Sequence, residues 1–274
     1  EIMDSIFDKQ WISQKNRYFT EDLYNSFARI LRPSFHTIEQ GLGYKLSKEQ
    51  ELLVKSEEGA RKRIKGVAGS GKTLVLAERA VNAYERTHNC VLILTYNITL
   101  RNYIHDKISA VRKEFPWEFF HISNYHDFIN NNMNNVGLDF EFLKDEEGNS
   151  KYISSEEFGK LAEKYVYSNI DLFENHNNEL PKYETILIDE TQENWIRIIM
   201  KYFASENAEI VAFADEKQNI YSRELDNEKM PRIPVQTGAW DRKLNKSYRL
   251  SQKIALLVTD FQKHFFADKY IVEQ

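Results

Sequence analysis

The sequence has one cysteine and no long apolar run, and both shortages limit what the protein can be. A single cysteine, Cys90, excludes an internal disulfide and fits a reducing compartment. No apolar stretch approaches the roughly 18 residues that are needed to span a membrane. The acidic, mixed N-terminus does not resemble a signal peptide. We therefore expect a cytoplasmic protein with no membrane partner.

The sequence also has no excess of positive charge. It carries 37 Lys and Arg residues against 42 Asp and Glu residues, which gives a net charge of -5. This balance argues against a strongly basic coat that binds nucleic acid without regard to sequence, although a local basic groove stays possible. With 274 residues and 42% hydrophobic residues, the chain can build one large domain or two modest ones.

Three of the ten glycines lie within six residues of one another, in Gly-Val-Ala-Gly-Ser-Gly-Lys-Thr. This is the P-loop pattern, in which glycines allow backbone N–H groups to surround phosphate oxygens at the start of a helix. Lys72 is expected to reach the β- and γ-phosphates, and the Thr73 hydroxyl to hold Mg²⁺. The alternative is a glycine-rich turn that matches by chance. The expected nucleotide-binding residues are Gly66, Val67, Ala68, Gly69, Ser70, Gly71, Lys72 and Thr73.

Apolar strand-like runs alternate with helical patterns along the chain. Expected strands end at residue 65 and span 90–96, 119–122, 185–188, 209–213 and 243–248. Expected helices span 74–84, 99–112, 195–203 and 252–265, and another starts at 126. Such alternation predicts an α/β fold with a parallel sheet, whose ligands bind where the strands end. The P-loop, Thr95, Asp189 and Asp215 all fall at the ends of expected strands.

Two carboxylates, Asp189 and Glu190, follow an apolar strand. In a P-loop protein the first can hold Mg²⁺ and the second can deprotonate the attacking water. The alternative is an ordinary acidic strand end. Further along, Gln218 can hydrogen-bond the γ-phosphate or belong to a polar loop. Tyr248 and Arg249 can stack on a base and neutralise phosphoryl charge, or simply begin a helix.

The order and spacing of these motifs resemble superfamily 1 helicases of the UvrD/Rep type, over residues 46 to about 255. The resemblance implies a RecA-like P-loop NTPase sheet flanked by helices, with ATP and Mg²⁺ as ligands. It implies that Gln50 recognises the adenine edge and that Arg79 packs near the base. It also implies that Gln218 is the residue that couples the γ-phosphate site to the rest of the motor, and that Arg249 is an arginine finger. From the residues alone, Ser47 resembles a helix N-cap, and the alternative for Gln50 is an ordinary exposed helix position. The single-stranded DNA contacts implied are Thr95, Tyr96, Asn97, Ser123, Tyr125 and His126.

The resemblance also divides the chain. Residues 1–44 are a helical lead-in, 45–128 and 184–240 are the two parts of the ATPase domain, and 129–183 are an inserted, mainly helical subdomain. Residues 241–274 contain the last motif and the start of a second motor domain that is truncated. The Ile-Thr-Leu-Arg-Asn-Tyr stretch after Asn97 resembles the helicase half of nuclease-related-domain fusions, which suggests a nuclease or effector partner.

Some residues depart from the helicase pattern. Glu193 replaces the usual Asp, Ala214 replaces the usual Gly, and Ser222-Arg223-Glu224 replaces a Gly-Trp-Arg whose Trp stacks on DNA. We therefore expect an ATP-hydrolysing helicase or translocase domain that acts on single-stranded DNA or a DNA junction and is weakly active alone. One alternative is a nucleotide-dependent switch that recruits a nuclease or effector without unwinding. A small-molecule kinase is a further alternative, which the paired carboxylates disfavour.

Overall fold

The computed structural model describes residues 46–95, 98–111, 113–135, 161, 164–165, 168, 170–189, 193–215, 230, 240–248 and 252–266. The chain divides into two compact units, Glu1–Leu46 and Ser47–Gln274, and the description below concerns the second unit. Among the described helices, none is both long enough and apolar enough to cross a membrane. The expected lead-in, most of the expected helical insertion, and residues 216–229 lie outside the described residues.

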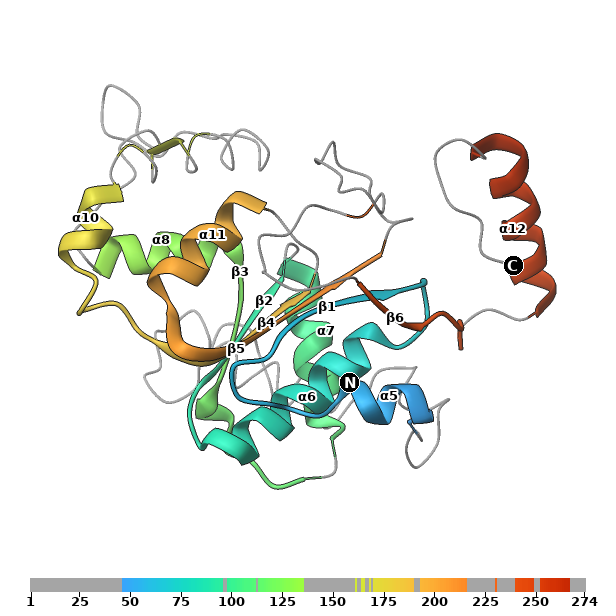
Figure 1. Cartoon of the computed structure of the whole chain (residues 1–274), viewed down its shortest axis with the longest axis horizontal. Helices are drawn as coiled ribbons and strands as arrows, with labels where there is room; N and C mark the ends of the chain where they lie inside the picture. Colours follow the sequence, from blue (N-terminus) through green and yellow to red (C-terminus); the bar gives the residue numbers. More distant parts are fainter. Residues whose placement is uncertain are drawn as a thin grey trace, which may run out of the picture. The chain divides into compact units, whose positions relative to one another are not determined.

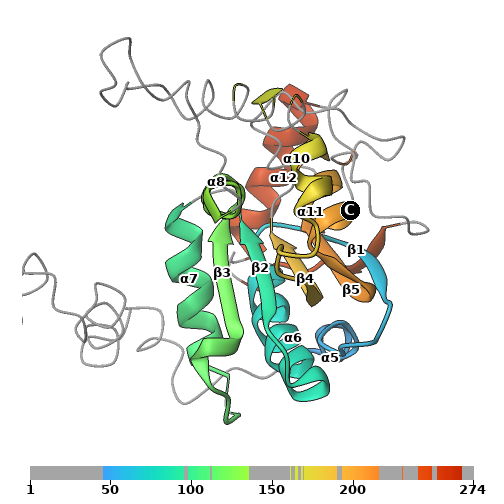
Figure 2. The same cartoon turned by 90° about the vertical axis from the view of Figure 1, so that its left-hand side faces the viewer.

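Six strands form one parallel sheet in the order β3-β2-β4-β5-β1-β6. Strands β3, β2 and β4 are seen side by side in Figure 2. Their neighbours in the sheet are often distant in sequence, as expected for strands joined by helical crossovers. The predicted parallel α/β fold is confirmed, and the arrangement is consistent with a RecA-like fold. The strands are β1 (Arg61–Gly66), β2 (Val91–Thr95), β3 (Phe120–Asn124), β4 (Tyr183–Asp189), β5 (Ala204–Ala214) and β6 (Asp241–Leu244).

Helices cover both faces of this sheet (Figure 1). Helices α6 (Lys72–Thr87) and α7 (Ile98–Ser109) pack on one face, and α8 (Tyr125–Asn135) and α11 (Glu193–Tyr202) on the other. Both faces are therefore apolar, so β2 is buried along its whole length, as strands between two helical layers are. The remaining described helices are α5 (Lys48–Leu53), η1 (Trp117–Phe119), α10 (Ile170–Asn175) and α12 (Gln252–Phe266).

Most element positions agree with the sequence pattern, and the differences have local causes. Helix α6 begins at Lys72 rather than Leu74, because Gly71 adopts a left-handed conformation (φ 87°) and acts as its N-cap. Strand β6 covers Asp241–Leu244 instead of 243–248, since the backbone beyond Leu244 turns to meet the glycine-rich loop. Strand β5 begins five residues early, at Ala204.

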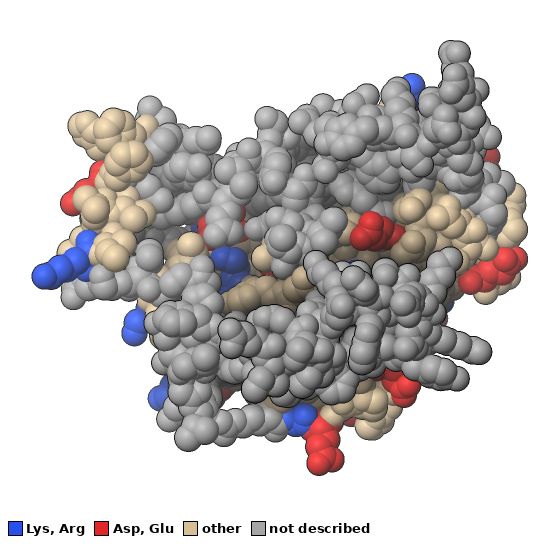
Figure 3. All heavy atoms as spheres, turned by 180° about the vertical axis from the view of Figure 1, so that it is seen from behind, with Lys and Arg blue, Asp and Glu red and all other residues tan. Residues whose placement is uncertain are grey.

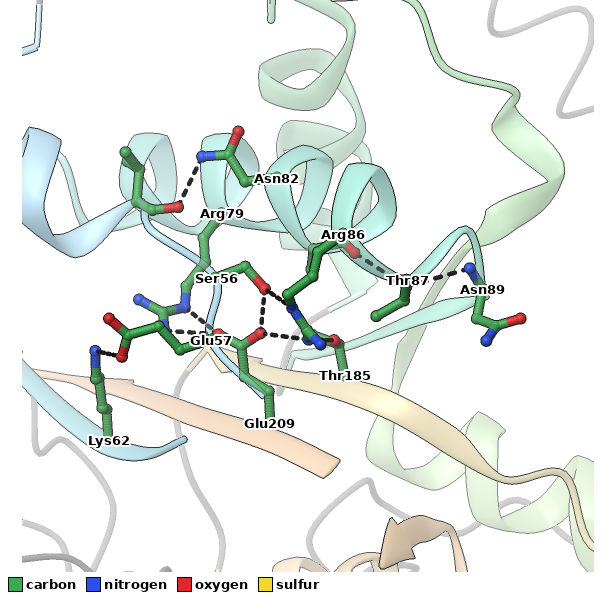
Figure 4. Close-up of polar contacts among 12 residues, drawn as sticks. Ser56, Glu57, Lys62, Arg79, Asn82, Arg86, Thr87, Asn89, Thr185 and Glu209 are labelled. Atoms are coloured by element: carbon green, nitrogen blue, oxygen red, sulfur yellow. Dashed lines mark hydrogen bonds and ion pairs between the residues drawn. The ribbon is translucent and has the colours of Figure 1, made fainter. Parts of the chain in front are cut away.

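A buried ion-pair network fastens α6 to the sheet (Figure 4). The Glu209 carboxylate of β5 accepts from Arg79 Nε at 2.7 Å and from Arg86 Nη2 at 3.1 Å. The Ser56 hydroxyl also donates to Glu209 and accepts from Arg86 Nε at 2.9 Å. Arg79 Nη1 donates to the Leu53 carbonyl at 2.6 Å, which ties in the end of α5. Because the side chains of Arg79 and Glu209 are fully buried, each charge depends on the other for solvation.

Removing one charge of this network should destabilise the domain strongly. Glu209→Gln leaves the buried Arg79 guanidinium uncompensated, and we expect a loss of about 3 kcal/mol in unfolding free energy. Chemical denaturation followed by circular dichroism measures it. The matched control is Glu57→Gln, which breaks the nearby pair with Lys62, whose side chains are 56% and 32% exposed. Because water screens that pair, Glu57→Gln should lower the unfolding free energy much less than Glu209→Gln. Equal losses of unfolding free energy in the two variants would contradict the role given to the network.

Candidate functional site

The six strand ends meet at one edge of the sheet and are followed by most of the motif residues. The glycine-rich loop (residues 66–73) follows β1, Asp189 ends β4, and Asp215 follows β5 directly. Thr95, at the end of β2, pairs in register with Asp189 and with Asn124 of β3. Because parallel strands place their carboxyl ends together, a site built from four distant segments arises at this edge.

The glycine-rich loop is too tightly folded to accept side chains at two of its glycines. A Cβ at Gly66 would lie 2.7 Å from Ser70 Oγ and 2.9 Å from Lys72 Cγ. Gly71 has φ +87°, and a Cβ there would lie 2.6 Å from Gln50 Nε2. The loop closes on itself with Ser70 N–H donating to the Val67 carbonyl at 3.1 Å. Close approach therefore favours glycine at both positions, and at Gly71 the left-handed backbone favours it as well.

Lys72 is folded back onto the loop. Its Nζ donates to the carbonyls of Gly66 at 2.8 Å and Val67 at 3.2 Å, and it pairs with Asp215 Oδ2 at 3.1 Å. The side chains of Lys72 and Asp215 are 13% and 3% exposed, so this is a largely desolvated charge pair. The sequence marked Asp215 as a strand-end residue but did not predict its contact with Lys72.

The loop also holds a buried hydroxyl that has no partner. Ser70 is 1% exposed, and its Oγ makes no hydrogen bond among the described residues. The first N–H groups of α6 lie beside it and, like those of any helix, lack acceptors within the helix. A buried donor, free N–H groups and a lysine together match the donors that bind a phosphate. The residues present therefore fit a polyphosphate ligand.

Gln50 lies inside the protein and contacts the glycine-rich loop. It is 4% exposed, its Nε2 donates to the Ser70 carbonyl at 3.0 Å, and its Oε1 accepts from Ser47 N–H at 2.9 Å. Ser47 Oγ in turn accepts from Gln50 N–H, which completes a capping box at the start of α5. The predicted helix cap at Ser47 is confirmed, but the view of Gln50 as an exposed helix residue is wrong.

A cavity of about 360 Å³ lies beside the loop. The backbone beyond β6 forms one side of it: Val67 N–H donates to the Leu244 carbonyl at 3.0 Å, and Tyr248 N–H donates to the Gly69 carbonyl at 2.9 Å. The Tyr248 ring is 55% exposed, with Lys246 Nζ 5.4 Å from its centroid. Sequence reasoning had assigned a nucleotide-binding role to two residues of the lining, Ser70 and Tyr248. The lining also contains Ser47, Lys48, Glu49, Lys243, Leu244, Asn245 and Lys246.

The structure describes only some of the remaining residues that are expected to bind metal or to act in catalysis. Asp189 is 5% exposed at the end of β4, and Thr73 is the second residue of α6, with intermediate exposure. Glu190, Gln218 and Arg249 lie outside the described residues. Their assigned roles stay predictions.

Arg79 is not available to a nucleotide in this structure. Its side chain is fully buried and contacts Glu209 and the Leu53 carbonyl. The resemblance had placed this arginine near the base, and the ion pair gives a different reason for its presence. The sequence offered no signal for the contact, because Arg79 and Glu209 are 130 residues apart.

Of the expected nucleic-acid contacts, the three whose side chains the structure describes, Thr95, Ser123 and Tyr125, are buried. Tyr125 is 1% exposed and belongs to the core, so its ring has no free face for a base. Its helical spacing with Phe128, Ile129 and Met133 was the signal for burial. Thr95 is fully buried, and Ser123 is buried with its Oγ bonded to the Asn124 carbonyl. Tyr96, Asn97 and the side chain of His126 lie outside the described residues.

A comparison with protein families gives the chain its class. A family model described as "Schlafen group 3, DNA/RNA helicase domain" matches residues 63–265, which include the glycine-rich loop, every described strand end and most of α12. The chain belongs to this family. A search of the curated proteins finds no match. The more specific assignments, to UvrD/Rep-type helicases and to nuclease-related-domain fusions, stay predictions.

The contact between Gly71 and Gln50 can be tested without any ligand. Gly71→Ala should destabilise the domain more than Gly59→Ala, because both positions have positive φ (87° and 66°) but only Gly71 has an atom within reach of the new Cβ. The left-handed conformation alone costs about 1–2 kcal/mol for alanine. In the background of Gln50→Ala the extra cost at Gly71 should disappear. Thermal unfolding of the four variants measures this, and an extra cost that persists would contradict the contact.

Proposed function

We propose that the chain binds and hydrolyses a Mg²⁺–nucleoside triphosphate, most simply ATP, as the motor domain of a helicase. The family match supports a nucleotide-dependent, helicase-like function. The single observation that carries the proposal is the glycine-rich loop, where Lys72 and the partnerless Ser70 hydroxyl lie beside the start of α6. Such a group of donors suits the oxygens of an anion such as phosphate. The adjoining cavity, with the Tyr248 ring in its wall, offers space for a base beside these phosphates.

The chain's own residues would divide the work as follows. Lys72 leaves the carbonyls of Gly66 and Val67 and donates to the β- and γ-phosphates. Thr73 and Asp189 would hold Mg²⁺, which when bound neutralises charge on the phosphate oxygens. The Tyr248 ring packs against the base.

Three further residues complete the proposed reaction. Glu190, which directly follows Asp189, accepts the proton of the attacking water. Gln218 hydrogen-bonds the γ-phosphate and reports its loss. Arg249 stabilises the negative charge that spreads over the transferring group. These roles come from the sequence motifs and their resemblance to superfamily 1 helicases.

Lysine 72 provides the primary test. Lys72→Ala should weaken binding of Mg²⁺–ATP roughly tenfold to hundredfold, because a charge-assisted contact to phosphate contributes about 1.5–3 kcal/mol. Isothermal titration calorimetry on the whole chain measures it, and chelation of Mg²⁺ with EDTA should also weaken binding. Lys62→Ala, which changes a partly exposed lysine of β1, is the matched control. An unchanged affinity of Lys72→Ala for Mg²⁺–ATP would contradict the assignment of residues 66–73 as a P-loop.

A second function is favoured by the placement of the expected DNA contacts. The Tyr125 ring is in the core, and on the described surface in Figure 3 basic and acidic side chains are interspersed. These observations suit a nucleotide-dependent switch that recruits a nuclease or another effector without unwinding nucleic acid.

Unwinding distinguishes the two functions. A motor should show ATP hydrolysis that single-stranded DNA or RNA stimulates and, in the full-length protein, displacement of a labelled strand from a duplex. A switch should bind the nucleotide with no stimulation by nucleic acid and no strand displacement. Lys72→Ala controls for contaminating ATPases in both assays.

A further inference from the structure

One hydroxyl outside the glycine-rich loop is buried and has no hydrogen-bond partner among the described residues. Thr95, the last residue of β2, is fully buried, and its Oγ1 makes no hydrogen bond to any of them. Buried hydroxyls are normally paired, because an unpaired one loses its hydrogen bonds to water without replacement. A second fully buried threonine, Thr185 of β4, follows this rule and accepts from Arg86 Nη2 at 3.2 Å. The Thr95 hydroxyl is therefore suited to a partner such as a bound water molecule.

The Thr95 side chain points to the same side of the sheet as the glycine-rich loop. Its neighbour Leu94 belongs to the core beneath α8 and α11, so Thr95 points to the opposite side, where α6 packs. Asp189 follows Ile188 of the same core, so its carboxylate is on the α6 side as well. Helix α6 begins at Lys72, directly after the loop. The hydroxyl, the carboxylate and the lysine expected to bind phosphate thus share one side of the sheet.

The register of the strands places the hydroxyl beside the carboxylate. Thr95 pairs with Asp189 across β2 and β4, and neighbouring strands lie about 4.8 Å apart. On its other side Thr95 pairs with Asn124 of β3, whose side chain is engaged at both ends. Asn124 Oδ1 accepts from Asp127 N–H at 2.8 Å, and its Nδ2 donates to Asp127 Oδ2 at 2.6 Å. Asp189, whose carboxylate has several acceptor positions, is therefore the neighbour that can share a water molecule with Thr95.

A water molecule at this place suits the metal site that the sequence assigns to Asp189. Mg²⁺ keeps several of its waters in proteins and is usually held by one or two carboxylates together with phosphate oxygens. Groups that hydrogen-bond to the ligands of a metal orient those ligands and tune its affinity. A threonine hydroxyl offers one donor and two acceptor positions, and the β-branched side chain holds them in place. Thr95 therefore has the chemistry of a group that orients a metal-bound water.

We propose that Thr95 is a positioning residue for the Mg²⁺ site: its hydroxyl holds a water of the metal's hydration shell against the Asp189 carboxylate. The inference rests on the proposed function, since it requires a Mg²⁺–nucleotide at the glycine-rich loop. It accounts for a hydroxyl that is buried on the loop's side of the sheet, rather than exposed for the single-stranded DNA contact that the helicase resemblance implies.

The first test measures how much Mg²⁺ the protein needs. Isothermal titration calorimetry follows binding of a non-hydrolysable ATP analogue to the whole chain at a series of free Mg²⁺ concentrations. Thr95→Val, which replaces the hydroxyl by a methyl group, should raise the Mg²⁺ concentration for half-maximal binding about tenfold, as loss of such an orienting group does. Thr95→Ser keeps the hydroxyl and should stay near the wild type. Thr185→Val, the matched control, removes a buried hydroxyl from the same side of the neighbouring strand and should leave the Mg²⁺ requirement unchanged.

Thermal unfolding without ligand gives a second readout, which a purely structural role would not produce. Thr185→Val removes the acceptor of a hydrogen bond from Arg86 and should lower the unfolding midpoint by about 2–4 °C. Thr95→Val removes a hydroxyl that has no such partner among the described residues, so it should leave the midpoint unchanged or raise it.

Two outcomes would overturn the proposal. One is a Thr95→Val variant that keeps the wild-type Mg²⁺ requirement; if it loses affinity for single-stranded DNA instead, Thr95 is a nucleic-acid contact. The other is a midpoint that falls as far in Thr95→Val as in Thr185→Val, because the hydroxyl would then already have a partner within the protein. If the wild type binds no analogue at any Mg²⁺ concentration, the proposed function itself fails.

Discussion

The close approach of backbone and side chains around Gly66 and Gly71 is the constraint on which the site depends. At both positions a single added carbon would meet another atom at less than 3 Å. This space is used by Ser70 Oγ and the Lys72 stem on one side and by the Gln50 carboxamide on the other. The loop can therefore hold its N–H groups and its lysine in one compact turn at the start of α6. Any larger residue would separate these donors.

The rest of the domain keeps this turn in place. Helix α6 is fastened at its middle and far end by Arg79 and Arg86, which share the Glu209 carboxylate of β5. The segment after β6 is hydrogen-bonded to the loop through Leu244 and Tyr248. Helix α5 contacts it through Gln50. Four elements that are distant in the sequence thus fix the position of a few phosphate-binding atoms, which is the preorganisation that a binding site requires.

The sequence predicted the parts of the structure that depend on local pattern. Apolar runs located the strands, and the order of strand and helix predicted a parallel sheet with its motifs at one edge, because these signals come from neighbouring residues. It could not predict contacts such as Gln50 with Ser70 or Lys72 with Asp215, since each joins segments that only the tertiary fold brings together. Tyr125 shows the converse case. Its motif suggested a role in binding, and the sequence analysis did not weigh its helical spacing with Phe128 and Ile129, with which it lies in the core.

The central claim, that the glycine-rich loop receives a Mg²⁺–nucleotide, is tested most directly by hydrogen–deuterium exchange of the whole chain with and without a non-hydrolysable ATP analogue and Mg²⁺. Slower exchange is predicted at the amides of residues 69–74 and at residues 245–248, which adjoin the loop and its cavity. The core strands β2 and β4, buried in either state, should change little. Protection that appears elsewhere but not at residues 69–74 would contradict the account.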